Sequence, residues 1–249
     1  MTEQHHTRIS VLISGSGSNL QALIDATKDG RLPNCSIVRV ISDKKAAFGL
    51  ERAKQAGIPT HYHGFPPYKE KFPQLPRQEQ RREFDRDLSK LILGDNPDIV
   101  ICAGYMLILT EPLLQALVDA KVPIINLHPA LPGEYNGVSH PSPLVFERAF
   151  KTPPLRNFSK LTSPDQTHAI DRAHADWKAG KITRTGVMIH YVILEVDMGT
   201  PILTKEIPFV DGEDDELEIF EEKLHKVEWG AIVEGTRTAI ERLWSEKSK

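Results

Sequence analysis

The chain has 249 residues, with 31 basic and 34 acidic side chains and a formal net charge of −3. This length suits one large domain or two small ones and is enough to bury a sizeable core. The composition, 40% hydrophobic and 26% charged, is typical of a folded globular protein and argues against a disordered tail, a collagen-like fibre or a coiled coil. The near-neutral charge disfavours a protein whose whole surface binds nucleic acid or an anionic membrane.

The first half of the chain alternates short apolar runs with helical patterns. Residues 8–14 are a β-branched run that predicts a strand, a Gly-Ser-Gly-Ser turn follows, and apolar spacing over 19–29 predicts a helix. The alternation continues with predicted strands at 36–41, 60–63, 98–103 and 123–127 and predicted helices at 46–56, 79–93 and 111–120. This order predicts an α/β fold with a doubly wound, mostly parallel sheet and helices on both of its faces.

Two proline-rich stretches interrupt the alternation. Residues 65–76 hold four prolines and predict a loop. Residues 141–166 hold five prolines and few periodic apolar positions. A structureless loop of that length is unusual in a compact domain, so the second stretch is interpreted as a small subdomain, a lid or an insertion specific to this chain.

The pattern that follows is different. Residues 169–179 predict a helix, and residues 187–194 and 201–210 predict two strands on either side of a short acidic loop. This pair predicts an antiparallel C-terminal addition to the sheet. A long helix is expected from about residue 215 to the end of the chain.

The two cysteines, Cys35 and Cys102, lie far apart and in or beside apolar stretches. They form neither a disulfide framework nor a zinc-ligand cluster, and they are interpreted as buried thiols in a reducing compartment. The N-terminal residues lack the pattern of a secretory signal, and no run approaches the ~18 apolar residues of a membrane helix. We therefore expect a cytoplasmic protein.

The glycine turn is the first candidate site. Gly15 and Gly17 allow close approach of the backbone to a ligand, and Ser18 and Asn19 add donors where the next helix begins. The turn is not a dinucleotide fingerprint, because Leu20 stands at the third glycine position, and it is not a P-loop. Taken alone, it fits a phosphate site and an ordinary strand-to-helix turn equally well.

Asn126 and His128 are the second candidate site. Strand alternation places both side chains on one face at the carboxyl end of a strand that Pro129 stops. An amide and an imidazole side by side can stabilise an oxyanion, and histidine can move a proton near neutral pH. Asp197, in a tight loop with Gly199, can orient that imidazole or relay a proton. Each residue alone also fits a structural role, as a satisfied strand-end histidine or a turn carboxylate.

Five stretches together resemble a known family. They are VLISGSGSNLQALIDA (11–26), AFGLERAKQAGIPT (47–60), PDIVICAGYMLIL (97–109), INLHPALP (125–132) and HYVILEVDMGTPIL (190–203). Their content and order resemble the phosphoribosylglycinamide formyltransferase family of folate-dependent enzymes. The resemblance implies transfer of the formyl group of 10-formyltetrahydrofolate to the amine of glycinamide ribonucleotide, giving formylglycinamide ribonucleotide and tetrahydrofolate in de novo purine biosynthesis.

The resemblance also implies catalytic roles for particular residues. Asn126 and His128 would stabilise the tetrahedral oxyanion, while Asp197 would set the charge of His128 and assist proton transfer through water. The amine would attack directly, with no metal and no covalent enzyme intermediate. Glu228 would hold the sugar or the glycinamide end of the ribonucleotide.

The same resemblance implies two further binding regions. Gly17, Ser18 and Asn19 would bind the 5′-phosphate of the ribonucleotide. Leu107 stands where the family commonly carries a basic residue, and Trp229 stands where it commonly carries a histidine. The folate would contact two loops, comprising Met106, Leu107, Ile108 and Leu109 and also Ile193, Leu194, Glu195 and Val196.

Two other formyl-group enzymes and one non-enzyme are the alternatives. A formyltetrahydrofolate hydrolase carries a regulatory domain before its first strand, and a methionyl-tRNA formyltransferase carries an added C-terminal barrel and a basic RNA-binding face. A degenerate folate- or nucleotide-binding module would not need Asn126, His128 and Asp197 together. We expect small-molecule substrates, no nucleic-acid or membrane partner, and a monomer or homodimer. Residues 1–249 are expected to form a single domain with a proline-rich insertion at about 141–166.

Overall fold

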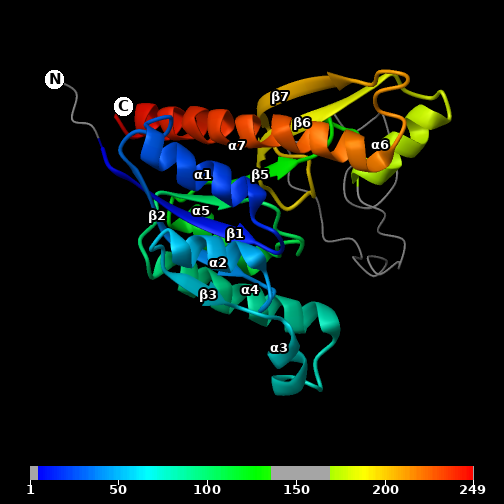
Figure 1. Ribbon diagram of the computed structural model, residues 1–249. Helices are drawn as coiled ribbons and strands as arrows, with labels where there is room; N and C mark the ends of the chain where they lie inside the picture. The colour runs from blue at the N-terminus through cyan, green and yellow to red at the C-terminus, as the bar shows by residue number, and fades with distance from the viewer. Residues whose placement is uncertain (1–4, 136–168, 249) are drawn as a thin grey trace.

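The computed structural model describes residues 5–135 and 169–248, so the predicted insertion at 141–166 lies outside the described residues. The described strands are β1 (Thr7–Ile13), β2 (Cys35–Ser42), β3 (Thr60–Tyr62), β4 (Ile99–Cys102), β5 (Ile124–His128), β6 (Arg184–Tyr191) and β7 (Pro201–Pro208). They form one sheet in the order β3-β2-β1-β4-β5-β6-β7 (Figure 1). Strands β1 to β5 pair in parallel, whereas β6 and β7 are antiparallel additions, which confirms the predicted fold class.

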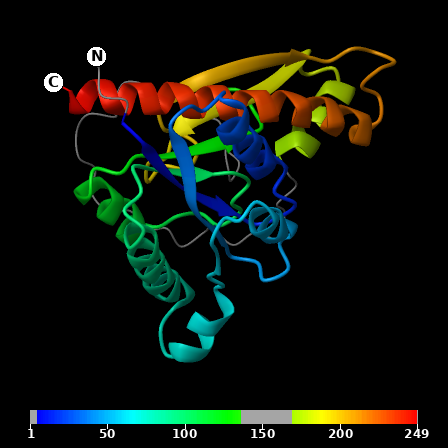
Figure 2. The same cartoon turned by 60° about the vertical axis from the view of Figure 1, so that its left-hand side comes forward.

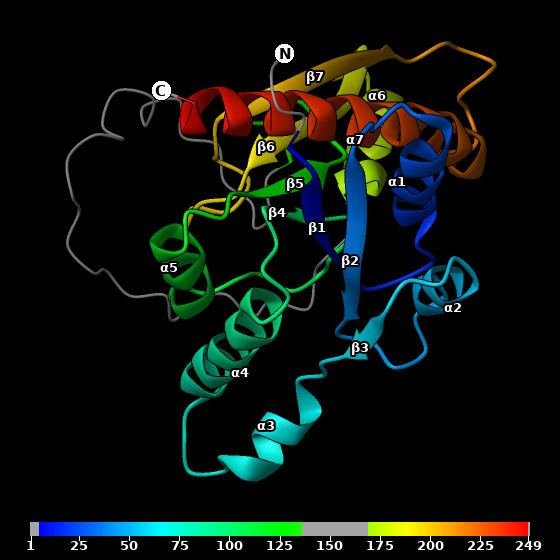
Figure 3. The same ribbon diagram turned by 90° about the vertical axis from the view of Figure 1, so that its left-hand side faces the viewer.

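Helices cover both faces of this sheet (Figure 3). The described helices are α1 (Ser18–Asp29), α2 (Phe48–Gln55), α3 (Pro66–Lys71), α4 (Arg77–Leu93), α5 (Glu111–Asp119), α6 (Ala169–Lys178) and α7 (Leu217–Lys247). One buried apolar cluster joins α1, α2 and α7 to the sheet, and a second joins α4 and α5 to its other face. None of the described helices is long and apolar enough to cross a membrane.

Strand β1 shows why the sheet needs cover on both faces. Ile9, Val11 and Ile13 belong to the cluster under α1 and α7, while Leu12 belongs to the cluster under α4 and α5. Successive side chains of a strand point to opposite faces. A strand that is apolar at nearly every position is therefore stable only between two layers of helices.

Two sequence-based boundaries were wrong. Residues 65–76, predicted as a loop, contain helix α3, because Pro66 and Pro67 occupy its first turn, where a missing N–H costs no helical hydrogen bond. The strand predicted at 187–194 instead runs from Arg184 to Tyr191. Its continuation past Tyr191 leaves the strand and forms the loop that carries Asp197.

The register of the strands gathers the candidate residues at one edge. Leu12 of β1 pairs with Cys102 of β4, and Cys102 pairs with Asn126 of β5. The glycine turn after β1, the loop after β4 and the end of β5 therefore lie at the carboxyl edge of the parallel strands. This is the edge at which open α/β sheets bind their ligands.

Helix α7 connects the last part of the chain to the first. It packs against α1, and its C-terminal end lies beside the beginning of β1 (Figure 2). There the Trp244 indole Nε1 donates to the Thr7 hydroxyl at 2.9 Å, and the Trp244 ring stacks on His5 with centroids 4.4 Å apart. The C-terminal helix thus contacts the beginning of β1, the central strand of the parallel part of the sheet.

Candidate active site

Four polar side chains meet beside the carboxyl end of β5. Asn126 and His128 lie on the same face of the strand, as the alternation predicts, and Asp197 lies between them. Asp197 Oδ2 is 3.6 Å from His128 Nδ1, and Asp197 Oδ1 is 3.5 Å from Asn126 Nδ2. The fourth member is His190 of β6, whose Nε2 lies 3.3 Å from Asn126 Nδ2. The structure therefore brings together the three residues predicted as catalytic.

His128 is held between two acceptors. Its Nε2 faces the Glu134 carbonyl oxygen at 3.3 Å, and its Nδ1 faces the Asp197 carboxylate. The side chain is only 8% exposed, and this burial holds the pKa of His128 below its ordinary value, although the Asp197 charge and the Glu134 carbonyl partly offset the shift. Burial disfavours the charged imidazolium. The two acceptors, one facing each ring nitrogen, favour it.

His190 is the member of the cluster that sequence reasoning missed. Its Nδ1 lies 2.9 Å from the Tyr191 carbonyl oxygen, so in the neutral ring this nitrogen carries the proton, and its Nε2 faces Asn126 Nδ2 at 3.3 Å and Asp197 Oδ1 at 3.5 Å. The Asn126 amide N–H₂ group then donates toward His190 Nε2 and Asp197 Oδ1. His190 stands directly opposite Asn126 in the antiparallel ladder, and only knowledge of that pairing would have pointed to it.

The loop that carries Asp197 folds back tightly on β6. Tyr191 N donates to Thr200 O at 3.1 Å and closes the loop. A Cβ atom at Gly199 would overlap the Tyr191 carbonyl oxygen, so only glycine fits there. Asp197 itself has a left-handed backbone with φ 57°, which costs free energy in a residue other than glycine. The loop geometry therefore fixes where the carboxylate can lie.

The glycine turn is locked to the start of α2. Gly17 has φ 72°, and a Cβ atom on it would lie 2.5 Å from Gly49 Cα. Gly49 N donates to Gly15 O at 3.1 Å, and Arg52 Nε donates to Ser16 O at 2.9 Å. The turn thereby presents backbone N–H groups at the N-terminus of α1. Such an arrangement favours the binding of an anion.

Asn19 and Glu228 form a buried pair beside this turn. Asn19 Nδ2 donates to Glu228 Oε2 at 3.1 Å, and both side chains are buried. Burial raises the pKa of Glu228, while the Asn19 bond and the nearby His225 lower it. Within the described residues Asn19 Oδ1 is buried without a hydrogen-bond partner. Glu228, assigned only by resemblance, therefore lies against the predicted phosphate-binding turn.

The two loops predicted to contact folate present apolar side chains at the surface. Met106, Ile108, Ile193 and Leu194 are large apolar side chains that remain exposed. Leu107 and Leu109 point the other way and pack, together with Val192, against the core cluster under α4 and α5. Side chains from both loops thus pack on the same core cluster, and Leu107 is one of these packing residues.

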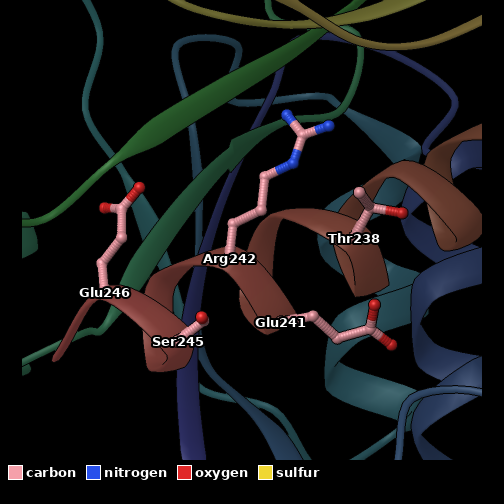
Figure 4. Close-up of a pocket in the computed structure, with 5 residues that line it drawn as sticks. All are labelled: Thr238, Glu241, Arg242, Ser245 and Glu246. Carbon is pink, nitrogen blue, oxygen red and sulfur yellow. The ribbon is translucent and has the colours of Figure 1, made fainter. Parts of the chain in front are cut away.

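One pocket of the described structure lies elsewhere. It has a volume of about 470 Å³ and is formed along the exposed side of α7 (Figure 4), with lining residues Thr238, Glu241, Arg242, Ser245 and Glu246. These residues begin ten positions after Glu228, about 15 Å along a helix, and include none of the candidate site residues. Among the described residues, no group of three or more His, Cys, Asp or Glu side chains is arranged to hold a metal ion.

Comparison with known proteins identifies relatives of this chain. A family model described as formyl transferase matches residues 7–152. A phosphoribosylglycinamide formyltransferase of Schizosaccharomyces pombe is 41% identical over 92% of this chain and 95% of its own length. One from Saccharomyces cerevisiae is 41% identical over 95% of this chain and 98% of its own. The crystal structure of glycinamide ribonucleotide transformylase 1 from Symbiobacterium toebii superposes with a TM-score of 0.68 at 28% identity, covering 94% of this chain and 88% of that one.

Proposed function

The chain belongs to the family of phosphoribosylglycinamide formyltransferases, which are formyl transferases of purine biosynthesis, and we propose that Asn126, His128 and Asp197 perform the transfer in it. The observation that carries this proposal is the convergence of an amide, an imidazole and a carboxylate at one strand end. The formyl donor is 10-formyltetrahydrofolate, and the acceptor is the primary amine of glycinamide ribonucleotide. The amine nitrogen bonds to the formyl carbon, the bond from that carbon to N10 of the folate breaks, and one proton passes from the amine to N10.

Asn126 stabilises the negative charge that develops on the formyl oxygen. Its amide Nδ2 is held in place by His190 Nε2 at 3.3 Å, and its second N–H, which makes only a long contact of 3.5 Å with Asp197 Oδ1, is the one that turns to the formyl oxygen. A donor fixed before the reaction costs no reorganisation when the charge appears. His190 is thus a positioning residue for Asn126 in this proposal.

His128 and Asp197 supply the second donor and the proton path. The Asp197 charge raises the pKa of His128 against the effect of burial, and so increases the fraction of imidazolium available to the oxyanion. The carboxylate also accepts a proton from the attacking amine through water, and returns it to N10 as the C–N bond breaks.

The ribonucleotide lies along the carboxyl edge between α1 and α7. The backbone of Gly17, Ser18 and Asn19 binds its 5′-phosphate, supported by the turn geometry at the N-terminus of α1. Glu228 accepts from the ribose hydroxyls or the glycinamide end. The unpartnered Asn19 Oδ1 fits a donor group of the same ligand, because a buried acceptor gains most from a matched donor.

The folate lies against the loops that follow β4 and β6. Two segments supply apolar surface and backbone groups for its ring system, namely Met106, Leu107, Ile108 and Leu109 on one side and Ile193, Leu194, Glu195 and Val196 on the other. The exposed side chains among them support this assignment, since a planar ring gains free energy by covering apolar surface.

We further propose that residues 1–249 form one domain, because Asn19 and Glu228 join opposite ends of the chain in a single site. Its partners are the two small-molecule substrates, with neither nucleic acid nor membrane, and it acts as a monomer or homodimer. The free thiols Cys35 and Cys102 support a reducing, cytoplasmic setting.

Two substitutions test the catalytic assignment. We expect His128→Ala to lower kcat by about 100-fold or more, the scale for loss of one oxyanion donor. Asp197→Asn removes the charge that raises the pKa of His128, so it should lower kcat and move the limb of the pH profile that reports His128 to lower pH. Both are measured by the absorbance of the folate product, with circular dichroism as the control for folding.

The outcome also separates the alternatives. Turnover of 10-formyltetrahydrofolate without the ribonucleotide would favour a hydrolase. Near-wild-type kcat in either folded variant would contradict the assigned role of that residue, while leaving the family membership untouched.

A further inference from the structure

Ser14 lies at the point where three strands end. It directly precedes the glycine turn and is 8% exposed. Its hydroxyl donates to Asp43 Oδ1, after β2, at 2.6 Å, and accepts from Met106 N, after β4, at 2.8 Å. Ser14 N also donates to Gly104 O at 2.9 Å. Three hydrogen bonds thus attach the segment after β4 to the end of β1: Ala103 N donates to Leu12 O, and the other two, to Gly104 and Met106, involve Ser14.

Asp43 fixes the direction of this hydroxyl. The carboxylate is buried at 5% exposure, and its other oxygen, Oδ2, lies 3.5 Å from Lys44 Nζ. Because the carboxylate can only accept, the Ser14 hydrogen points to Asp43 and its lone pairs face the Met106 amide. The serine therefore cannot turn away from the loop without leaving a buried charge with one hydrogen bond fewer.

The glycine turn depends on other restraints. Gly15 O accepts from Gly49 N, and Ser16 O accepts from Arg52 Nε. Neither bond involves the Ser14 hydroxyl. Removal of that hydroxyl should therefore free the Met106 amide, while Ser14 N still holds Gly104 O, Arg81 still holds Ile108 O, and α2 continues to hold the turn.

We propose that Ser14 is a positioning residue for the formyl donor: its hydroxyl holds the Met106 segment in the conformation that contacts the folate. This inference rests on the proposed assignment of residues 106–109 to the donor site. Ser14 directly precedes the turn proposed to bind the phosphate of the ribonucleotide. In this inference it nevertheless affects the binding of the folate and not that of the ribonucleotide.

Steady-state kinetics of Ser14→Ala test the proposal. We expect the KM for 10-formyltetrahydrofolate to rise about three- to tenfold, the loss expected for one hydrogen bond, with the KM for glycinamide ribonucleotide changed by less than about twofold. Ser14→Thr keeps the hydroxyl and should restore much of the donor affinity. An equal rise in both KM values, or no rise in either, would overturn the proposal.

Ser89→Ala provides the matched control. Ser89 is also a buried serine, at 4% exposure, and its hydroxyl donates to Arg86 O at 2.8 Å within α4. Ser89→Ala removes the same hydroxyl oxygen and a comparable hydrogen bond, at a place outside the donor loop. A loss of stability in this variant with unchanged KM values would show that destabilisation alone does not raise the donor KM.

Hydrogen–deuterium exchange of the ligand-free protein separates the inference from the proposed donor site. In Ser14→Ala, the peptide that contains Met106 should exchange faster, while the peptide over residues 15–21 should not change. Unchanged exchange at Met106 would overturn the inference whatever the loop binds. Faster exchange with an unchanged donor KM would overturn the placement of the donor at residues 106–109, and the role of Ser14 with it.

Discussion

A single buried carboxylate, that of Glu228, shows how binding and stability compete at the residue scale. It lies behind the glycine turn with one hydrogen bond, from Asn19, and its burial raises its pKa above the ordinary value of 4.5. The folded protein therefore binds this proton more tightly than the unfolded chain. The contribution to stability is fully present below about pH 4.5 and is lost as the pH rises through the folded pKa.

Replacement of this carboxylate should make the protein more stable and less active. Glu228→Gln keeps an acceptor for Asn19 but removes the buried charge, so we expect a higher melting temperature than wild type at pH 7. The difference should shrink as the pH falls toward 4.5, which thermal unfolding across this range measures. The KM for glycinamide ribonucleotide should rise by about tenfold, the loss of a charge-assisted hydrogen bond. A variant that is no more stable at pH 7 would contradict this account.

The residues proposed as catalytic differ in how far the sequence could predict them. Asn126 and His128 were predictable, because strand alternation alone places them on one face. Asp197 required a resemblance to a family, because nothing local distinguishes it from a turn carboxylate. His190 and Ser14 were not predicted, because their roles depend on strand pairing and on hydrogen bonds between segments distant in sequence.

At the scale of secondary structure, helix α2 acts as a clamp on the turn after β1. A Cβ atom at Gly49 would lie 2.5 Å from Ile13 Cδ1 and 3.1 Å from Gly17 Cα. Gly49→Ala should therefore move α2 away from the turn and destabilise the protein by about 1–3 kcal/mol. Because the turn then loses its hydrogen bond from Gly49 N, the KM for glycinamide ribonucleotide should rise more than the KM for the folate.

Gly230→Ala is the control for that substitution. Gly230 lies inside α7, and a Cβ atom there would meet nothing within 4 Å. Alanine is the better helix former by about 1 kcal/mol, so this variant should unfold at an equal or higher denaturant concentration than wild type. If Gly49→Ala also unfolded at an equal or higher denaturant concentration than wild type, close packing of α2 against the turn would not be what holds the turn in place.

The elements themselves were largely predictable, because helical and alternating periodicity is strong in this chain. The errors arose where local composition had two interpretations. Prolines in residues 65–76 indicated a loop, yet two of them begin α3. The apolar run after residue 187 indicated a strand that continues to residue 194, yet β6 ends at Tyr191 and Val192 packs against the core cluster under α4 and α5, a contact between segments that periodicity does not encode.

At the scale of the whole molecule, the end of α7 stabilises the central strand without touching the site. Trp244→Phe keeps the ring but removes the donor to the buried Thr7 hydroxyl. We expect a loss of about 1 kcal/mol in the free energy of unfolding, measured with urea, and unchanged kcat and KM values. A changed KM for either substrate would mean that strain at this end of the sheet reaches the opposite edge.

The pairing of Asn19 with Glu228 spans 209 residues of sequence. During synthesis the glycine turn can form early, since β1, α1 and β2 are neighbours along the chain, but its second wall arrives only with α7. Until α7 is synthesised, the nascent chain therefore carries the proposed phosphate-binding turn without Glu228 beside it. Closing a contact between residues so distant in sequence carries an entropy cost. In our proposal the ribonucleotide contacts both the glycine turn and α7, so its binding would slow the detachment of α7.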